Sequence, residues 1–281
     1  DLFKPVEDSS VKETIKKSFG IKNRSICYMG RLSYEKSIDQ VIRAFALINK
    51  KIPELNLMII GDGPERKNLE KLTKELNLND AVIFTGSLLY NGDLVRALQA
   101  NDLFISASKS ENMPLSVLEA MAIGLPMVLV KEKGLAELIQ ENINGVFAKT
   151  DDPADLAEKT RFLLSDSDLL NKLGRGSRQM AMEYSNEKVT DLLIKSYEKT
   201  IAEYKLKKYN MNENMPAQGW SAFSGKICLY LEFYHFLGGL LYKNIGTGLL
   251  SSYDNQKKTL QSLNIDFMER WDSSCDILQI N

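Results

Sequence analysis

Short apolar runs alternate with amphipathic segments between residues 25 and 150, and this alternation limits the possible folds more than any other feature. Each run is hydrophobic almost without interruption. A strand of this kind must be covered on both faces, which is typical of a parallel sheet. The runs are Ser25–Met29, Leu57–Ile60, Val82–Phe84, Leu103–Ile105 and Pro126–Val130.

The segments between these runs have the period of a helix. Pro64 is expected at the first position of one such helix, where its missing N–H costs nothing. Strand–helix alternation predicts an α/β fold with a Rossmann-like, doubly wound parallel sheet, in which ligands bind at the carboxyl ends of the strands. The apolar positions that indicate the helices are Ile38, Val41, Ile42, Phe45, Ala46, Ile48, Leu69, Leu72 and Leu76.

The second half of the chain changes character. Residues 153–208 are expected to be helical, and within them Asp166-Ser167-Asp168 is interpreted as a helix cap rather than a metal-binding motif. Residues 209–223 are polar and without period, which indicates a linker. Residues 224–281 then begin a partial second α/β unit with strands over 226–231 and 276–280, too small to bury a full core by itself.

Composition excludes several classes of function. The net charge of −1 gives no reason to expect nucleic acid as a partner. The chain has no apolar run near the roughly 20 residues that span a membrane. Three scattered cysteines indicate reduced thiols in a cytoplasmic protein, and a single histidine, His235, leaves no basis for a multi-histidine metal site. We therefore expect no metal and no cofactor.

The segment Glu111–Glu119 carries the most chemical information. Two carboxylates bracket a turn that opens a helix, with Pro114 expected at its first position. Backbone N–H groups of Met113, Leu115 and Ser116 would favour an anion at this helix N-terminus. The two carboxylates would accept hydrogen bonds from hydroxyl groups. Leu115, Val117 and Leu118 are expected to pack the helix, so that Glu119 is partly enclosed.

Basic residues follow the first strand. Arg31 and Lys36 come after Gly30, which allows a sharp turn, and either cation could meet a phosphate. The turn Gly61-Asp62-Gly63-Pro64 follows the second strand, but its spacing does not match a dinucleotide fingerprint, which argues against NAD. Taken singly, each of these residues is better explained as part of an ordinary surface loop or turn.

As a set, these motifs resemble the donor-binding half of a family 4 glycosyltransferase with the GT-B fold. The resemblance rests on Gly30-Arg31 with Glu35-Lys36, the Gly-Asp-Gly-Pro turn, Phe84-Thr85-Gly86, and the two glutamates eight positions apart followed by Ala-Met-Ala-x-Gly-x-Pro. It covers roughly residues 23–205. Met113-Pro114 stands where Phe-Gly is usual in that family, which leaves the number of backbone contacts open.

The resemblance implies roles for particular residues. Arg31 and Lys36 would hold the donor diphosphate and Glu111 would lie by the transferred sugar, so these three are the expected catalytic residues. Glu119 would bind the ribose hydroxyls. The other expected donor-binding residues are Gly30, Gly61, Asp62, Gly63, Gly86, Met113, Pro114, Leu115 and Ser116. The family retains anomeric configuration, needs no metal and uses a nucleotide-sugar donor, here expected to be UDP-glucose.

The organisation of the chain also follows from the resemblance. Residues 1–22 resemble an interdomain linker with a short helix, residues 23–208 the donor domain, and residues 224–281 the start of a second family member. Similarity to diacylglycerol glucosyltransferases implies hexosyl transfer to a membrane lipid at the inner face of the cell membrane. Three alternatives remain: a nucleotide-sugar-binding module without catalysis of its own, a related epimerase or phosphorylase, and a plain interaction domain.

Overall fold

The computed structural model describes residues 2–89, 92–111, 114–213, 227–228 and 276–277. By compactness the chain divides into two units, Asp1–Ser185 and Asn186–Asn281. The first unit consists of α1 (Ser9–Ser18), β1 (Ser25–Met29), η1 (Tyr34–Lys36), α2 (Ile38–Asn49), β2 (Asn56–Ile60), α3 (Arg66–Glu75), β3 (Val82–Gly86), α4 (Gly92–Gln99), β4 (Leu103–Ser106), α5 (Leu115–Ile123), β5 (Met127–Val130), α6 (Lys133–Leu138), β6 (Gly145–Ala148), α7 (Pro153–Ser165), α8 (Ser167–Ala181) and η2 (Met182–Tyr184). The described part of the second consists of α9 (Asn186–Glu213), β7 (Ile227–Cys228) and β8 (Asp276–Ile277).

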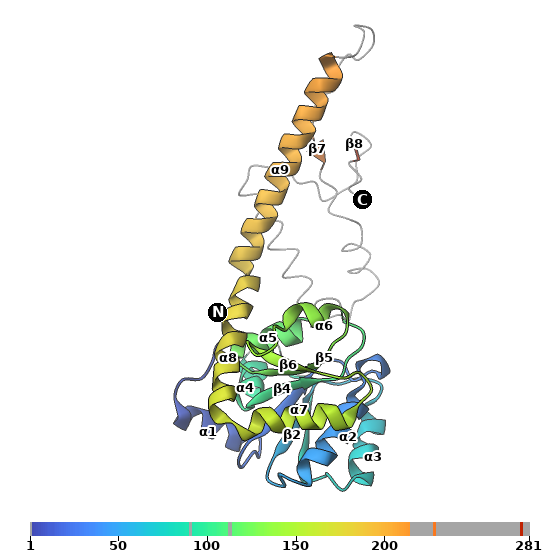
Figure 1. Ribbon diagram of the computed structural model, residues 1–281, viewed down its shortest axis with the longest axis vertical. Coiled ribbons are helices and arrows are strands. Elements are labelled where there is room, and N and C mark those ends of the chain that lie inside the picture. Colours follow the sequence, from blue (N-terminus) through green and yellow to red (C-terminus); the bar gives the residue numbers. More distant parts are fainter. Residues whose placement is uncertain (1, 90–91, 112–113, 214–226, 229–275, 278–281) are drawn as a thin grey trace. The chain divides into compact units, whose positions relative to one another are not determined.

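The first unit is built on a six-stranded parallel sheet with the order β3-β2-β1-β4-β5-β6. This is the order of the Rossmann fold, and it confirms the predicted fold class. Helices cover both faces (Figure 1): α2 packs against α3 and α7, whereas α5 packs against α4 and α8. Every residue of β1, β4 and β5 is buried, as their uninterrupted hydrophobicity predicts.

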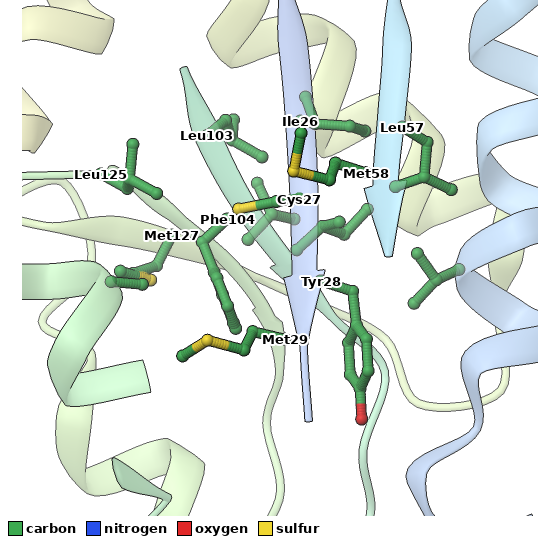
Figure 2. Close-up of a cluster of buried hydrophobic side chains, with 14 of the residues drawn as sticks. Ile26, Cys27, Tyr28, Met29, Leu57, Met58, Leu103, Phe104, Leu125 and Met127 are labelled. Carbon is green, nitrogen blue, oxygen red and sulfur yellow. The ribbon is translucent and has the colours of Figure 1, made fainter. Parts of the chain in front are cut away.

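The core lies on both sides of the central strands. Figure 2 shows the consecutive β1 side chains Ile26 to Met29, which point to the two faces of the sheet, with their neighbours from β2, β4 and the segment around β5. Phe45 from α2 and Phe104 from β4 are among the largest fully buried side chains. Cys27 lies in the same core as a free thiol, and burial raises its pKa, which makes it an inert apolar residue.

An ion-pair cluster fastens α1 to the amino ends of β1 and β4. Asp102 precedes β4, and its Oδ1 accepts from Lys12 at 2.7 Å. Its Oδ2 accepts from Lys16 and from the backbone N–H of Ser25, both at 3.0 Å. The ammonium of Lys16 also donates to the carbonyl of Asn23 at 2.9 Å. Helix, strand and preceding turn are thereby joined through one carboxylate.

Several local expectations differ from the structure. β6 was not expected, since Gly145 starts it and too few apolar residues follow to stand out. α3 begins at Arg66, so Pro64 lies outside the helix and not at its first position. α9 runs to Glu213, five residues into the expected linker at 209–223. The Asp166 cap is confirmed, because its carboxylate accepts from the N–H groups of Asp168 and Leu169.

Much of the expected second α/β unit lies outside the described residues. Of the two strands expected there, Ile227–Cys228 and Asp276–Ile277 are described, and they form a parallel pair. The glycine turns near 238 and 246, the helix over 249–263 and His235 lie outside them. The boundaries at 23, 208 and 224 stay predictions. Among the described helices, none is both long and apolar enough to cross a bilayer.

Candidate functional site

The candidate residues gather at the carboxyl edge of the sheet, where the strand order reverses. β1 lies between β2 and β4, so the loops after β1 and β4 leave neighbouring strand ends in different directions. In open α/β sheets this switch point is where ligands bind. The loop after β1 carries Arg31 and Lys36, and the loop after β4 carries Glu111, so all three lie at the expected place.

The glycines after β2 allow its loop to pack against the loop after β1. A Cβ on Gly61 would stand 2.1 Å from the carbonyl oxygen of Gly30, and one on Gly63 would stand 2.3 Å from that of Leu32. The N–H of Leu32 donates to the carbonyl of Asp62 at 3.0 Å. No larger residue fits at 61 or 63, because the opposing atoms are backbone. Close packing of two loops thus accounts for both glycines, and a donor-binding role for them stays a prediction.

Asp62 is engaged within its own turn. Its carboxylate accepts from the N–H of Gly63 at 2.7 Å and from Arg66 at 3.0 Å. These two partners, the backbone bond first, lower the pKa of Asp62. Gly86 ends β3 with a φ of 70°, and a Cβ there would lie 3.1 Å from the same guanidinium of Arg66. Asp62 and Gly86 therefore take part in the packing of the β2 and β3 ends, and a donor-binding role for either stays a prediction.

Lys36 and Glu111 form an ion pair across the switch point. The ammonium of Lys36 lies 2.7 Å from Oε1 of Glu111, although 75 residues separate the two in sequence. It also donates to the carbonyl of Ser110 at 3.0 Å. Both side chains are partly enclosed, with 18% and 19% of their surface exposed. A lysine ammonium has three donors, so these two bonds leave one N–H for a ligand.

Buried groups hold Glu111 from the other side. The hydroxyl of Ser108 donates to the same Oε1 at 3.1 Å, and Ser108 is 1% exposed. The backbone carbonyl of Glu111 accepts from the N–H of Gly134 at 3.1 Å, which joins this loop to the start of α6. Sequence reasoning missed Ser108 and Gly134. Nothing in local spacing singles out one serine among several in the same loop.

Tyr28 of β1 is buried close enough to the site for the charge of Glu111 to act on it. Figure 2 shows its hydroxyl pointing along β1 toward the carboxyl end of the strand, and it donates weakly to the carbonyl of Arg31 at 3.4 Å. Burial, then the charges of Glu111 and Glu35, raises the pKa of Tyr28, so its phenol stays neutral. Tyr28 therefore adds no charge to the site, and the side chain of Arg31 is exposed.

Helix α5 supplies the remaining candidates. Pro114 is the N-cap rather than the first helical residue, and its carbonyl accepts from the N–H groups of Val117 and Leu118 at 3.0 and 3.3 Å. Helix geometry leaves the first N–H groups, those of Leu115 and Ser116, without intrahelical acceptors. Leu115 is 57% exposed, so the expectation that it packs the helix is wrong. Met113 lies outside the described residues.

Glu119 lies one turn into α5. Its side chain is half-buried, as expected from its apolar neighbours, of which Val117 is 2% exposed. The helix ends at Gly124, whose φ of 85° is the left-handed conformation of a C-cap. The helix thus ends where the glycine of the Ala-Met-Ala-x-Gly motif stands, whereas it begins one residue after Pro114. Glu119 belongs to the same helix whose N-terminus follows the loop after β4.

A surface hollow of about 460 Å³ lies at the opposite, amino edge of the sheet. It is lined by the N-terminal segment at Pro5, by Asp102 and by Arg178 of α8, and none of the candidate residues reaches it. Arg178 donates to the carbonyls of Phe3 and Ala122, which ties the N-terminal segment to α5. The chemistry at the switch point, rather than the size of this hollow, identifies the candidate site.

A model of the family described as glycosyl transferases group 1 matches residues 11–180, more than half of the chain. The chain is a member of this family. The match covers the whole of the sheet and both loops of the switch point. Within the described residues, no group of three or more histidine, cysteine or acidic side chains is placed to hold a metal ion.

Similar proteins place the group 1 domain among GT-B glycosyltransferases. The C-terminal domain of a glycosyl transferase group 1 protein from Francisella tularensis is 26% identical, with a TM-score of 0.60 over 66% of this chain and 97% of that one. Alr3699/HepE from Anabaena, solved in complex with UDP, is 23% identical, with a TM-score of 0.61 over 69% of this chain and 54% of that one. The second likeness concerns the fold alone.

A characterised relative comes from Streptococcus pneumoniae. Its alpha-monoglucosyldiacylglycerol synthase is 33% identical over 142 residues, which is 50% of this chain and 32% of the relative. The chain spans about half the length of the first curated relatives that it matches. The group 1 domain is therefore shared, whereas the rest of each relative has no counterpart in the match.

Proposed function

We propose that the chain is the C-terminal, donor-binding half of a retaining family 4 glycosyltransferase and that it binds a UDP-sugar, with UDP-glucose as the first candidate. The observation that carries the proposal is the Lys36–Glu111 pair at the switch point of a group 1 domain. A cation beside a carboxylate suits a ligand with a phosphate next to a hydroxyl-bearing sugar.

The proposed roles are those that the family resemblance implies, and the pairing of Lys36 with Glu111 supports them. The remaining N–H of Lys36 and the exposed guanidinium of Arg31 would meet the diphosphate, together with the N–H groups that open α5. Glu111 would accept a hydrogen bond from a sugar hydroxyl, and Glu119 from the ribose. The Anabaena protein has also been solved with UDP-glucose, which supports a UDP-sugar as the ligand class.

The proposed chemistry needs no metal. The bond between the anomeric carbon and the diphosphate oxygen breaks, and negative charge develops on the leaving diphosphate. Lys36 and Arg31 would stabilise that charge, which is electrostatic catalysis. The acceptor hydroxyl forms the new bond to the anomeric carbon from the face that the diphosphate leaves, and its proton passes to a diphosphate oxygen.

The acceptor is proposed to be diacylglycerol or a glycosylated diacylglycerol at a membrane surface. The similarity to alpha-monoglucosyldiacylglycerol synthase supports this choice. Because the chain spans about half of its curated relatives, a second domain would have to supply the acceptor site. A donor-binding module without transfer activity of its own is the second candidate.

Calorimetry with the whole chain tests the donor site. Titrations with UDP, UDP-glucose and GDP-mannose should show binding of both uridine ligands and weaker binding of the guanosine one. Lack of binding by all three would contradict the proposal and favour a plain interaction domain. Release of glucose from bound UDP-glucose, measured over hours, then separates a catalytic domain from a module that only binds.

A further inference from the structure

Glu111 uses its two carboxylate oxygens unequally. Oε1 accepts from Lys36 at 2.7 Å and from Ser108 at 3.1 Å. In the described part of the chain, no hydrogen bond reaches Oε2. The side chain as a whole is 19% exposed, so Glu111 is partly enclosed but remains accessible. An accessible carboxylate oxygen that accepts no hydrogen bond from the described residues is able to accept one from a ligand.

Ser108 is itself rigidly placed. It is 1% exposed, and its N–H donates to the hydroxyl oxygen of Ser106 at 3.2 Å. Ser106 is the last residue of β4 and is 3% exposed, so this bond ties the backbone of Ser108 to the end of the strand.

Lys36 cannot orient the carboxylate by itself. An ammonium acts as a point charge, and the terminal torsion of a glutamate side chain is soft, so one ionic contact leaves the carboxylate plane free to rotate. A second donor on the same oxygen, arriving from a different element, removes that freedom. Ser108 is placed to do this.

We propose that Ser108 is a positioning residue, which locks Oε1 of Glu111 so that Oε2 is presented to a hydroxyl of the donor sugar. This inference rests on the proposed function and deepens it, because it names the residue that orients Glu111 toward the sugar. The chemical class recognised through Ser108 is a hexose hydroxyl attached to a diphosphate.

The test compares two ligands on each variant. The ratio of the Kd for UDP to the Kd for UDP-glucose isolates the contribution of the sugar. Ser108→Ala should lower this ratio about three- to tenfold, the loss of one hydrogen bond, while the Kd for UDP stays within about twofold. Ser108→Thr keeps the hydroxyl and should restore the ratio. Ser87→Ala, an exposed serine on another loop of the same edge, is the matched control and should change neither value.

A double-mutant cycle separates positioning from mere structural support. Glu111→Gln should reduce the ratio at least as much as Ser108→Ala, and the double variant should lose nothing beyond Glu111→Gln, because Ser108 acts only through that carboxylate. An unchanged ratio in Ser108→Ala overturns the inference. The inference is also overturned if the losses of the two single variants add up in the double variant. The same holds if Ser108→Ala weakens the binding of UDP and of UDP-glucose equally. A wild-type chain that binds neither ligand instead refutes the proposed function itself.

Discussion

Two lysine–carboxylate clusters stand at opposite edges of the same sheet, and they are built for different purposes. At the amino edge, both oxygens of Asp102 are taken, by Lys12 on one side and by Lys16 with the Ser25 N–H on the other. At the carboxyl edge, Glu111 receives its described donors on one oxygen only. A closed cluster holds elements together, whereas an open one keeps capacity for a ligand.

The surroundings sharpen this contrast. Lys16 is 6% exposed and also bonds a backbone carbonyl, so its charge depends wholly on partners inside the protein. Lys36 lies in a short loop helix, η1, and keeps one donor unused by the described residues. Removing a partner should therefore cost stability at the amino edge and ligand affinity at the carboxyl edge.

The largest effect is expected from Asp102→Ala. It leaves Lys16 buried without its counter-charge, and breaking a buried pair in this way costs about 3–5 kcal/mol in the free energy of unfolding. Urea unfolding followed by circular dichroism measures the loss. Lys71→Ala, which removes an exposed pair on α3, is the control and should change stability by less than about 0.5 kcal/mol. A similar small change for Asp102→Ala would show that the amino-edge cluster is not a structural clamp.

Lys36→Ala, at the carboxyl edge, should lower ligand affinity and leave stability almost unchanged. Loss of a charged donor to phosphate should weaken UDP binding about 10- to 100-fold, while the free energy of unfolding changes by less than about 1 kcal/mol. Calorimetry and urea unfolding on the same preparation measure both quantities. If Lys36→Ala kept its affinity for UDP but lost free energy of unfolding, the two edges would not differ as described.

Glu119→Ala tests the ribose contact and should have a smaller effect. UDP binding should weaken about fivefold, the value of a single hydrogen bond. Wild type should discriminate against 2′-deoxy-UDP by a similar factor, and the variant should not discriminate. Equal discrimination by both proteins would remove Glu119 from the ribose site.

The smallest effect concerns pH. Burial by itself raises the pKa of Asp102, but Lys12 and Lys16 outweigh it, so the pKa is lowered from 3.8. A lowered folded-state pKa stabilises the fold above pH 3.8, and that contribution is lost as pH falls through the folded-state value. Wild type should therefore lose stability below pH 3.8 more steeply than Asp102→Asn. Parallel curves for the two proteins would contradict this account of the amino-edge cluster.

Local pattern predicted the large elements well and their ends less well. Five of the six sheet strands follow from uninterrupted apolar runs, since burial on both faces leaves a clear mark in sequence. β6 was not predicted from the sequence, because a strand at the sheet edge that begins with Gly145 needs fewer apolar residues. Pro64 and Pro114 were each placed inside a helix, whereas both precede the first helical residue, because proline suits several neighbouring positions at a helix start.

The candidate site shows the same division. Arg31, Lys36, Glu111 and Glu119 could be selected from sequence because they sit at strand ends and at a helix start, where ligands bind. The packing roles of Gly61 and Gly63 could not, since the atoms that exclude a side chain there belong to another loop. The same holds for Ser108, whose importance depends on which oxygen its hydroxyl meets.

The sequence by itself determined the alternation of strands and helices, and with it a sheet whose carboxyl edge holds the charged loops. The period of hydrophobic residues is a local property, so it can be recognised from the sequence without knowledge of the fold. Only the tertiary structure decided that β4 lies beside β1, which brings Lys36 to Glu111 across 75 residues. Contacts over that separation depend on the order of the strands and on the path of the loops. The spacing of residues along the chain predicts neither of these.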